Sequence, residues 1–471
     1  MKKPKKPSAS KPKGRRKKTA AIANVPAAIN PRHHPDAAGI DVGAEEFVAA
    51  LPPDRSEQTV RTFPSYTSGV EALRDWLLEH GIKTAALEST GNYWIMLYDK
   101  LTEAGIDVYL VNARHVKGVP GKKTDVCDSQ WLQQLHAAGL LRKSFRPALE
   151  IVPLRYLMRH RAEMVEHAAT QLHLMQKVLT EMNLKLHHVF SDIDGVSAQA
   201  IISAILAGER DAHALAKLRD RRCKSPLQDI LEALNGDYRA EYLFVLRQAW
   251  ESWQQVQKAI AACDEQLAAL VGKVESRVQT TVPAAPTKQQ HRLAKNSPNM
   301  SIFQTGWRFY GVDLSDIPGV SAGLISTLVS EVGTRGQMLG AFCSAGAFAS
   351  WLGLCPDNRV SGGKVLKART RKVSSRLARA MRLAAFGLQR SDDPMGQMLR
   401  RFKGKLGKAE GTTATAHKLA RVIYGVIKSQ RRYDEKEAFK VSPQKLARRH
   451  RRLQEEAAKL GFALTQLPAA A

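Results

Sequence analysis

The sequence predicts an open α/β sheet of mixed direction, followed by a long helical, coiled-coil-like segment and a mainly α-helical C-terminal domain. Short apolar runs separated by turn residues alternate with helical patterns between residues 37 and 150. Beyond them, Ile151 to Leu179 continues helically without glycine, and Glu241 to Ser276 does so with a single glycine. The C-terminal run KVLKARTRKVSSRLARAMRLAAFGL passes from a basic segment into an amphipathic helix.

The first domain is predicted element by element. AAGIDVGAEEFVAALPPD and TVRTFPSY contain three short strand patterns and predict a three-stranded antiparallel start. SGVEALRDWLLEHG reads as a helix that Gly81 ends, TAALES as a strand, NYWIMLYDKLTEAG as a helix and IDVYLVNA as a strand. TDVCDSQWLQQLHAAGLL predicts a last helix with Thr124 as its N-cap. The predicted order is β-β-β-α-β-α-β-α.

The charge of the chain indicates a polyanionic partner. The 471 residues include 72 Lys and Arg against 44 Asp and Glu, a formal net charge of +28. No window approaches the roughly 18 apolar residues of a membrane span, and MKKPKKPSASKPKGRRKKTA lacks a signal-peptide core. Five cysteines without a CxxC pair predict free thiols. We expect a cytoplasmic, nucleoid-associated protein without a membrane partner.

Composition divides the rest of the chain. Residues 1–36 predict a disordered basic arm that attracts phosphates, or a solubilising tail. The domains predicted are this arm (1–36), the α/β domain (37–150), a helical or coiled-coil region (151–277), a linker or insertion (278–300), a C-terminal domain (301–435) and a basic helical tail (436–471). The long helices suit a protein–protein contact or a strut within one subunit.

An internal repeat joins the middle and the C-terminal part. SDIDGVSAQAIISAI at Ser191 recurs as SDIPGVSAGLISTLV at Ser315. A glycine between an apolar residue and a helix is typical of a helix-hairpin-helix turn, whose backbone N–H groups can meet a phosphate. A purely structural hairpin is the alternative.

Four carboxylates lie on three elements of the first domain. Asp41 is in the first strand, and Glu88 ends the strand that follows the first helix. Asp125 and Asp128 are spaced i and i+3, so both project from one helix face. Their convergence would create repulsion that Mg²⁺ relieves, and Mg²⁺ prefers hard oxygen ligands. Alternatively, each carboxylate has a separate structural role as a turn residue, a strand-end charge or a helix-dipole partner.

Basic residues lie near the four carboxylates and also in the C-terminal domain. Lys122 and Lys123, with His115 and Lys117, would steer nucleic acid toward the carboxylates. In the C-terminal domain the candidate phosphate contacts are Arg359, Lys364, Lys367, Arg369, Arg371, Lys372 and Arg376. Some of these are expected to be solvated surface only. The tail sequence QKLARRHRRLQ suits RNA and DNA equally.

The sequence resembles the IS110 family of insertion-sequence transposases. In the N-terminal half GIDVG, ALESTGNYW and KKTDVCDSQ carry the resemblance. In the C-terminal half it rests on DIPGVSAGLISTLVSEVG, FASWLGLCPDNRVSGGK and AHKLARVIYGVIKSQRRYDE. It covers roughly Ala37 to Glu435 and implies a RuvC-like, RNase H-like DEDD domain followed by a transposase domain with a catalytic serine.

The resemblance also implies the chemistry. Asp41, Glu88, Asp125 and Asp128 would hold Mg²⁺, and Ser361 would attack DNA. It further implies a tetramer with composite sites and a structured bridge RNA that pairs with donor and target DNA. From the residues themselves, Gly362 and Gly363 would let backbone approach a phosphate. A glycine-serine turn on a basic surface explains the same string.

Two rival functions stay open at this level. A metal-only RuvC-like nuclease or Holliday-junction resolvase would use the same carboxylates and leave Ser361 as a turn residue. A non-catalytic nucleic-acid-binding protein would keep its affinity and its biological effect when Asp125 is replaced by Asn. Both enzymes would instead lose cleavage and still bind DNA.

Overall fold

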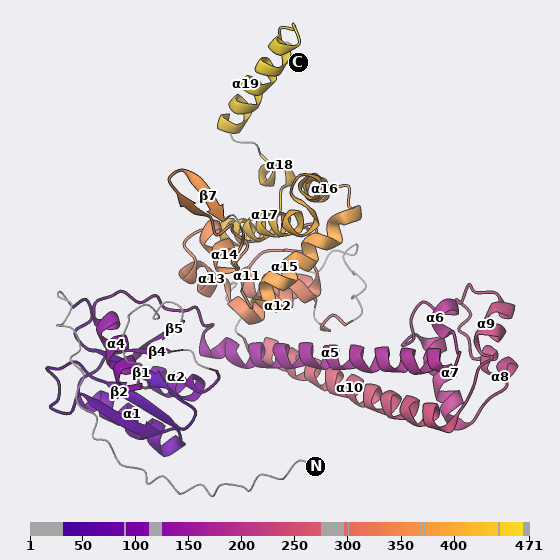
Figure 1. Cartoon of the computed structure of the whole chain (residues 1–471), viewed down its shortest axis with the longest axis horizontal. Helices are drawn as coiled ribbons and strands as arrows, with labels where there is room; N and C mark the ends of the chain where they lie inside the picture. Colours follow the sequence, from indigo (N-terminus) through magenta and orange to yellow (C-terminus); the bar gives the residue numbers. More distant parts are fainter. Residues whose placement is uncertain are drawn as a thin grey trace, which may run out of the picture. The chain divides into compact units, whose positions relative to one another are not determined.

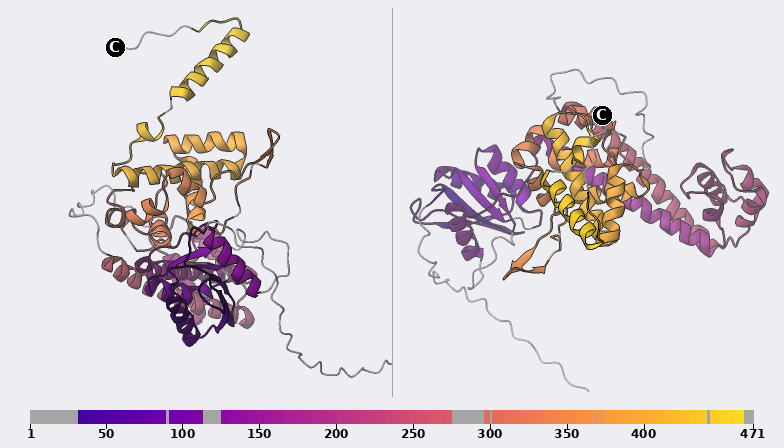
Figure 2. Two further views of the ribbon diagram at one scale, coloured as in Figure 1. Left: turned by 90° about the vertical axis from the view of Figure 1, so that its left-hand side faces the viewer. Right: turned by 90° about the horizontal axis from the view of Figure 1, so that it is seen from above.

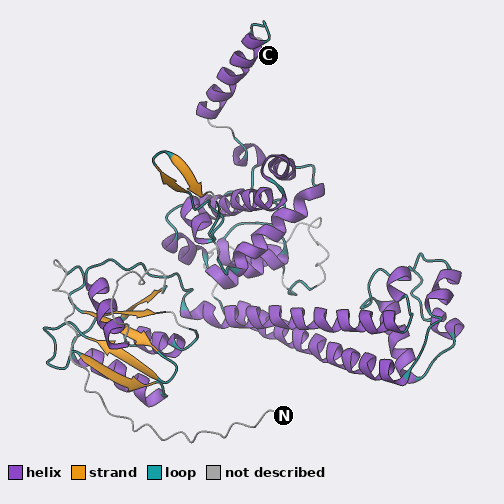
Figure 3. Ribbon diagram, in the orientation of Figure 1, coloured by secondary structure: helices purple, strands orange, loops and turns teal. Residues whose placement is uncertain are grey.

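The computed structural model describes residues 32–88, 91–112, 125–274, 296–299, 301–367, 369–371, 373–440 and 443–464. The chain divides into two compact units, Met1–Arg146 and Pro147–Ala471. Figure 3 shows a group of strands in the first unit and a small hairpin among the helices of the second. Among the described residues, no helix is both long and apolar enough to cross a membrane.

The first unit is built on a five-stranded mixed sheet in the order β3-β2-β1-β4-β5. Its strands are β1 (Ala37–Val42), β2 (Glu46–Ala50), β3 (Val60–Pro64), β4 (Thr84–Glu88) and β5 (Asp107–Val111). β1, β2 and β3 pair antiparallel, whereas β1–β4 and β4–β5 are parallel. The predicted mixed sheet and its element order are confirmed.

Helices cover both faces of this sheet. Helices α1 (Thr67–Glu79) and α2 (Trp94–Glu103) pack on the face that carries Ile40 and Leu87. Helix α4 (Asp125–Ala137) packs on the opposite face (Figure 1). There Leu132 belongs to one apolar cluster with Ala86 and Val111. The last helix is shorter than predicted, because Gly139 adopts a φ of 71°, a left-handed conformation that ends helices.

The second unit begins with a pair of long helices. After a short 3-10 turn (Leu149–Ile151), α5 (Val152–Glu181) lies side by side with α10 (Ala240–Lys273) in Figure 1 and Figure 2. The chain passes between them through four short helices: α6 (Leu186–Val189), α7 (Val196–Ala207), α8 (Ala212–Lys217) and α9 (Leu227–Ala233). A shared apolar core joins all six helices. The two long helices predicted from the sequence are therefore present.

A helical domain follows. Its helices are α11 (Ile302–Tyr310), α12 (Ala322–Val332), α13 (Arg335–Ala341), α14 (Ala345–Trp351), α15 (Arg376–Gly387), α16 (Pro394–Leu406), α17 (Lys408–Ser429), α18 (Glu435–Ala438) and α19 (Pro443–Lys459). A 3-10 turn (Leu388–Arg390) follows α15. Strands β6 (Arg359–Ser361) and β7 (Lys364–Lys367) form the hairpin that the sequence did not predict. Helix α17 is central, since both its ends and its middle contribute buried side chains.

Buried charges join α5 to its neighbours. The Arg159 guanidinium donates to both carboxylate oxygens of Glu331 on α12, at 2.9 and 2.8 Å, and Glu331 is buried. Arg161, also buried, makes a similar two-bond contact with Asp264 of α10, at 2.6 and 3.0 Å. Two parallel N–H···O bonds fix the geometry of such a pair. These contacts set the register of the two long helices against each other and against α12.

Candidate active site

Asp41 and Glu88 are neighbours at one edge of the sheet. The parallel β1–β4 ladder pairs Gly39 with Ala86 and Ile40 with Leu87, so Asp41 and Glu88 are the next residues on the two strands. Ile40 and Leu87 belong to the core beneath α1 and α2. Because side chains alternate along a strand, Asp41 and Glu88 point to the other face, the one that α4 covers. Both side chains are half-buried.

The absence of a side chain at Gly39 lets α4 approach this face closely. A Cβ atom at Gly39 would lie 2.2 Å from the backbone N of Gln133 and 2.4 Å from the carbonyl O of Ser129. Real Cβ atoms do not come this near to backbone, so any other residue would push α4 away. Gly39 precedes Asp41 by two residues on the same face, and the GIDVG motif therefore contains both the spacer and the carboxylate.

Two hydrogen bonds show in which direction α4 crosses the sheet. The Gln133 side-chain amide donates to the Ala37 carbonyl at 3.1 Å, and the His136 ring lies 2.8 Å from the Thr84 hydroxyl. Ala37 and Thr84 are the first residues of β1 and β4. The C-terminal part of α4 thus lies at the start of these strands, and the helix runs antiparallel to them.

The N-terminus of α4 therefore lies toward the carboxylate edge. From Ser129 back to Asp125 the helix extends about 6 Å, and from Gly39 on to Asp41 the strand extends about 7 Å. Asp128 is half-buried in the first turn of α4. Asp125 is the first residue of α4, and its side chain lies outside the described residues. The elements bring Asp41, Glu88 and Asp128 to the same end of one face of the sheet.

His136 anchors α4 and was missed from the sequence. It is 1% exposed and packs against the Tyr109 ring, with 4.5 Å between centroids. Burial, with a further contribution from His34, lowers the pKa of His136 from 6.5 to about 4. The ring is neutral at pH 7 and pairs with Thr84 as an uncharged group. Its spacing from Ser129, Leu132 and Gln133 on one helix face is the signal that marks it as sheet-facing.

The described side chains do not by themselves form a complete metal site. Among them, no group of three or more His, Cys, Asp and Glu residues is arranged to hold a metal ion. Asp125 is outside that set of side chains. The residues Lys122 and Lys123, together with His115, Lys117 and Thr124, lie outside the described residues as well.

Ser361 lies beside a two-residue turn. It pairs with Lys364 at the closed end of the β6–β7 hairpin, and Gly362 and Gly363 form the turn with φ values of 54° and 76°. Positive φ at both central residues defines a type I′ turn, which suits the twist of a hairpin and favours glycine. Ser361 and Lys364 are exposed. Within the described part of the chain, no hydrogen bond to the Ser361 hydroxyl is present.

The predicted basic contacts of this region are distributed around the hairpin. Arg359 and Lys367 pair at its open end, although their side chains are not described, and Lys372 lies outside the described residues. Arg369 is exposed, and Arg371 is exposed and donates to the Ser350 carbonyl. Arg376 is exposed and donates to the Glu163 carboxylate at 3.0 Å. Lys364, Arg369, Arg371 and Arg376 are thus the predicted contacts whose described side chains are exposed to solvent.

The carboxylates belong to the first compact unit and Ser361 to the second. Comparison with known families divides the chain in a related way. Residues 38–184 match the model of the IS110-type DEDD domain, described as a transposase. Residues 313–399 match a model described as the transposase IS116/IS110/IS902 family. No curated protein matches the chain. The first match contains all four carboxylates and the second contains the β6–β7 hairpin.

Proposed function

We propose, from its membership of the IS110 family of insertion-sequence transposases, that this chain cuts and rejoins DNA with Ser361 as the attacking group. In this proposal Asp41, Glu88, Asp125 and Asp128 hold Mg²⁺. A structured bridge RNA selects the donor and target DNA, and the protein acts as a tetramer. The family match supports the DNA transposase activity.

The observation that carries the proposal is the convergence of carboxylates at the edge where β1, β4 and the start of α4 meet. Asp41 and Glu88 come directly after Ile40 and Leu87, which pair in the β1–β4 ladder. Asp128 lies on α4, the helix that packs closely against Gly39. An all-carboxylate donor set suits a hard divalent cation rather than a thiolate- or imidazole-seeking metal. When bound, such a cation stabilises negative charge on the reacting phosphate and its attacking and leaving oxygens.

In this proposal Ser361 carries out a transesterification. Its Oγ forms a bond to phosphorus while the bond from phosphorus to a sugar oxygen breaks; the serine loses its proton, and the departing oxygen gains one. Attack by the freed end of another strand reverses the exchange and releases the serine. The exposed hairpin suits access to a DNA strand, and Lys364 beside Ser361 places a cation next to the phosphate.

The RNA and oligomer assignments rest on charge and on the family resemblance. A net charge of +28 favours binding to polyanions such as DNA and RNA. The α5–α10 pair presents a long surface on which protomers can associate. Exposed Tyr156 and Phe244 lie on these two helices.

One observation favours a second function. Ser361 lies beside a type I′ turn, and the two glycines of RVSGGK are the residues that such a turn favours. The turn therefore accounts for this sequence without a catalytic role for the serine. A RuvC-like nuclease or junction resolvase that uses the carboxylates without a serine would be built from the same sheet edge. The two functions differ in whether DNA becomes covalently bound to the protein.

The test uses a plasmid that carries the gene with its native flanks, and amplification of excised circular junctions. Ser361→Ala is compared with Ser374→Ala, an exposed serine of the same domain. Asp41→Asn is compared with Asp75→Asn, an exposed aspartate on α1. We expect junctions in both controls and none in Ser361→Ala or Asp41→Asn. Junctions that persist in Ser361→Ala, with no DNA retained on denatured wild-type protein, would favour the metal-only function.

A further inference from the structure

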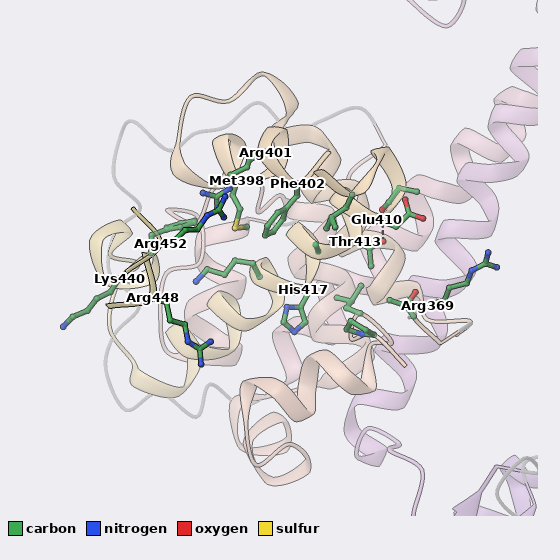
Figure 4. A pocket seen from close by; sticks show the side chains of 18 residues that line it. Arg369, Met398, Arg401, Phe402, Glu410, Thr413, His417, Lys440, Arg448 and Arg452 are labelled. Atoms are coloured by element: carbon green, nitrogen blue, oxygen red, sulfur yellow. Dashed lines mark hydrogen bonds between the residues drawn. The ribbon is translucent and has the colours of Figure 1, made fainter. Parts of the chain in front are cut away.

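A large cavity lies along one side of the α16–α17 helix pair in the second unit. Its volume is about 1670 Å³. Gly407, with a φ of 95°, is the only residue between the two helices. Gly411 brings them close, because a Cβ there would lie 2.6 Å from the backbone N of Lys403. The cavity is lined by one face of each helix and by segments from the β6–β7 region and from α19 (Figure 4).

Its lining combines apolar and cationic side chains. Met398, Phe402 and Leu406 contribute from α16 at helical spacing, and Phe439 contributes from the end of α18. The charged lining residues are cations except for Glu410. The cations are Arg369, Arg401, Lys418, Lys440, Arg448 and Arg452. In Figure 4 Phe402 and His417 lie in the middle of the lining, with Arg448, Arg452 and Lys440 on one side and Arg369 on the other.

Phe439 and His417 contribute aromatic rings to the cavity lining. The Lys418 ammonium donates to the Ala438 carbonyl and lies 5.0 Å from the centroid of the Phe439 ring, which fixes that ring against α17. Burial, and to a lesser extent the positive charges of Arg421 and Lys418, lowers the pKa of His417. His417 is therefore a neutral ring at pH 7, able to stack or to form hydrogen bonds. The cavity has uncharged rings at its centre and cations around them.

We propose that this cavity binds an unpaired nucleotide of a single-stranded nucleic-acid segment. The base enters between the Phe402 and His417 rings, and the flanking phosphates meet Arg401, Arg448 and Arg452. An unpaired base exposes a π-face that can stack on aromatic side chains, whereas bases in a duplex are already stacked on each other. A surface that bound duplex phosphates would need cations but no apolar centre. The inference rests on the proposed function in taking nucleic acid as the ligand.

Photocrosslinking locates the ligand despite the many other cations of the chain. The full chain carrying Asp41→Asn, a variant that we expect to bind without cleaving, is irradiated with three probes that contain 5-iodouracil. They are a short single-stranded DNA, the same sequence as RNA, and the DNA duplex. We expect the single strand to crosslink to a peptide containing Phe402 or His417. Crosslinks with DNA identify a donor or target strand as the source, and crosslinks with RNA identify a guide.

Matched variants separate stacking from charge. Phe402→Leu should lower the crosslink yield on the order of tenfold, while Phe386→Leu should leave it unchanged. Phe386 is 59% exposed and does not line the cavity. Lys403 lies over its ring, as Arg401 lies over the Phe402 ring. Arg452→Gln should reduce the slope of log affinity against log salt by about 0.7, and Arg451→Gln, its neighbour outside the cavity, should not.

Three results would overturn the proposal. They are crosslinks confined to other parts of the chain, equal crosslinking of duplex and single strand at this peptide, and equal effects of Phe402→Leu and Phe386→Leu. Because the experiment needs binding without catalysis, it can succeed even if Ser361 proves not to be a nucleophile. A chain that recombines DNA but shows no crosslink here would reject the cavity alone.

Discussion

The carboxylate edge and the β6–β7 hairpin differ in what holds them in place. Asp41 and Glu88 follow strand residues that are fully buried, and a helix packs over them with no room for a side chain at Gly39. Beside Ser361, Val360 is 59% exposed, and no described atom lies within 4 Å of the position that a Cβ would take at Gly362 or Gly363. The first arrangement depends on tertiary packing and the second on local backbone conformation. The two regions should therefore respond differently to substitution and to pH.

The largest effect is expected where packing is broken. Gly39→Val would force β1 and α4 apart, because its Cβ meets the backbone of Gln133 rather than a flexible side chain. We expect the free energy of unfolding of the first unit to fall by about 3 kcal/mol or more, with loss of cleavage. Hydrogen exchange of β1 peptides in the full chain measures it.

The control for that substitution is Gly272→Ala in α10, where the added Cβ would meet no described atom within 4 Å beyond the backbone of its own helix and its chain neighbours. Alanine is the better helix former, so stability should rise slightly. Unchanged exchange of β1 in Gly39→Val would show that α4 can shift freely, and would contradict the packed arrangement of the carboxylate edge.

A pH change should affect the stability of the first unit, which contains the carboxylate edge, through His136. Its pKa is about 4 in the folded chain and 6.5 in the unfolded chain. Between these values the unfolded state binds a proton that the folded state does not, so stability falls as the pH drops from 6.5 to 4. The loss attributable to this group is up to about 3 kcal/mol.

His136→Gln removes the titrating ring, and its amide can still reach Thr84. The difference in stability between wild type and His136→Gln should therefore shrink as the pH falls from 6.5 to 4, as measured by exchange of the sheet peptides. A difference that stays constant with pH would mean that His136 is solvated or charged in the folded chain.

The smallest change in stability is expected at the hairpin, where the effect is local. Gly362→Val places a β-branched residue at positive φ, which costs about 1–2 kcal/mol in the turn. Gly362→Asn gives Asn-Gly, a preferred type I′ pair. We expect Gly362→Val to reduce excised junctions, Gly362→Asn to retain them, and both to leave the thermal unfolding of the second unit nearly unchanged. Equal activity of the two variants would mean that the turn does not position Ser361.

The two copies of the repeat, SDIDGVSA at Ser191 and SDIPGVSA at Ser315, show that similar local sequences can start their helices at different positions. In the second copy Ser321 caps α12, which begins at Ala322, and Gly319 has a φ of 84°. In the first copy α7 begins at Val196, one residue after Gly195, whose φ is −75°. The equivalent serine, Ser197, accepts instead a hydrogen bond from the Asp220 N–H at 2.8 Å. The two segments, which differ at Asp194 and Pro318, thus start their helices two positions apart, and Ser197 has a distant partner where Ser321 has a local one.

Much of the first domain was predictable because strand and helix periodicity are local properties. The element order and the mixed sheet followed from short apolar runs, and the four carboxylates from their places on those elements. The hairpin was missed, since RVSGGKVLK is a short basic run without apolar alternation strong enough to suggest strands. The α16–α17 cavity could not be predicted at all, because its lining joins residues as distant as Leu354 and Arg452.

Four features follow from the sequence alone: the charge of the chain, the order of its elements, the positions of the acidic residues on them and the glycine pair beside Ser361. These depend on residue type and on interactions a few positions apart. The tertiary structure decided that β1 pairs with β4 in the register that aligns Asp41 with Glu88, and that α4 crosses antiparallel to them. It also decided that His136 is buried neutral. Register, crossing direction and desolvation arise from contacts between segments far apart in the chain, which no local pattern encodes.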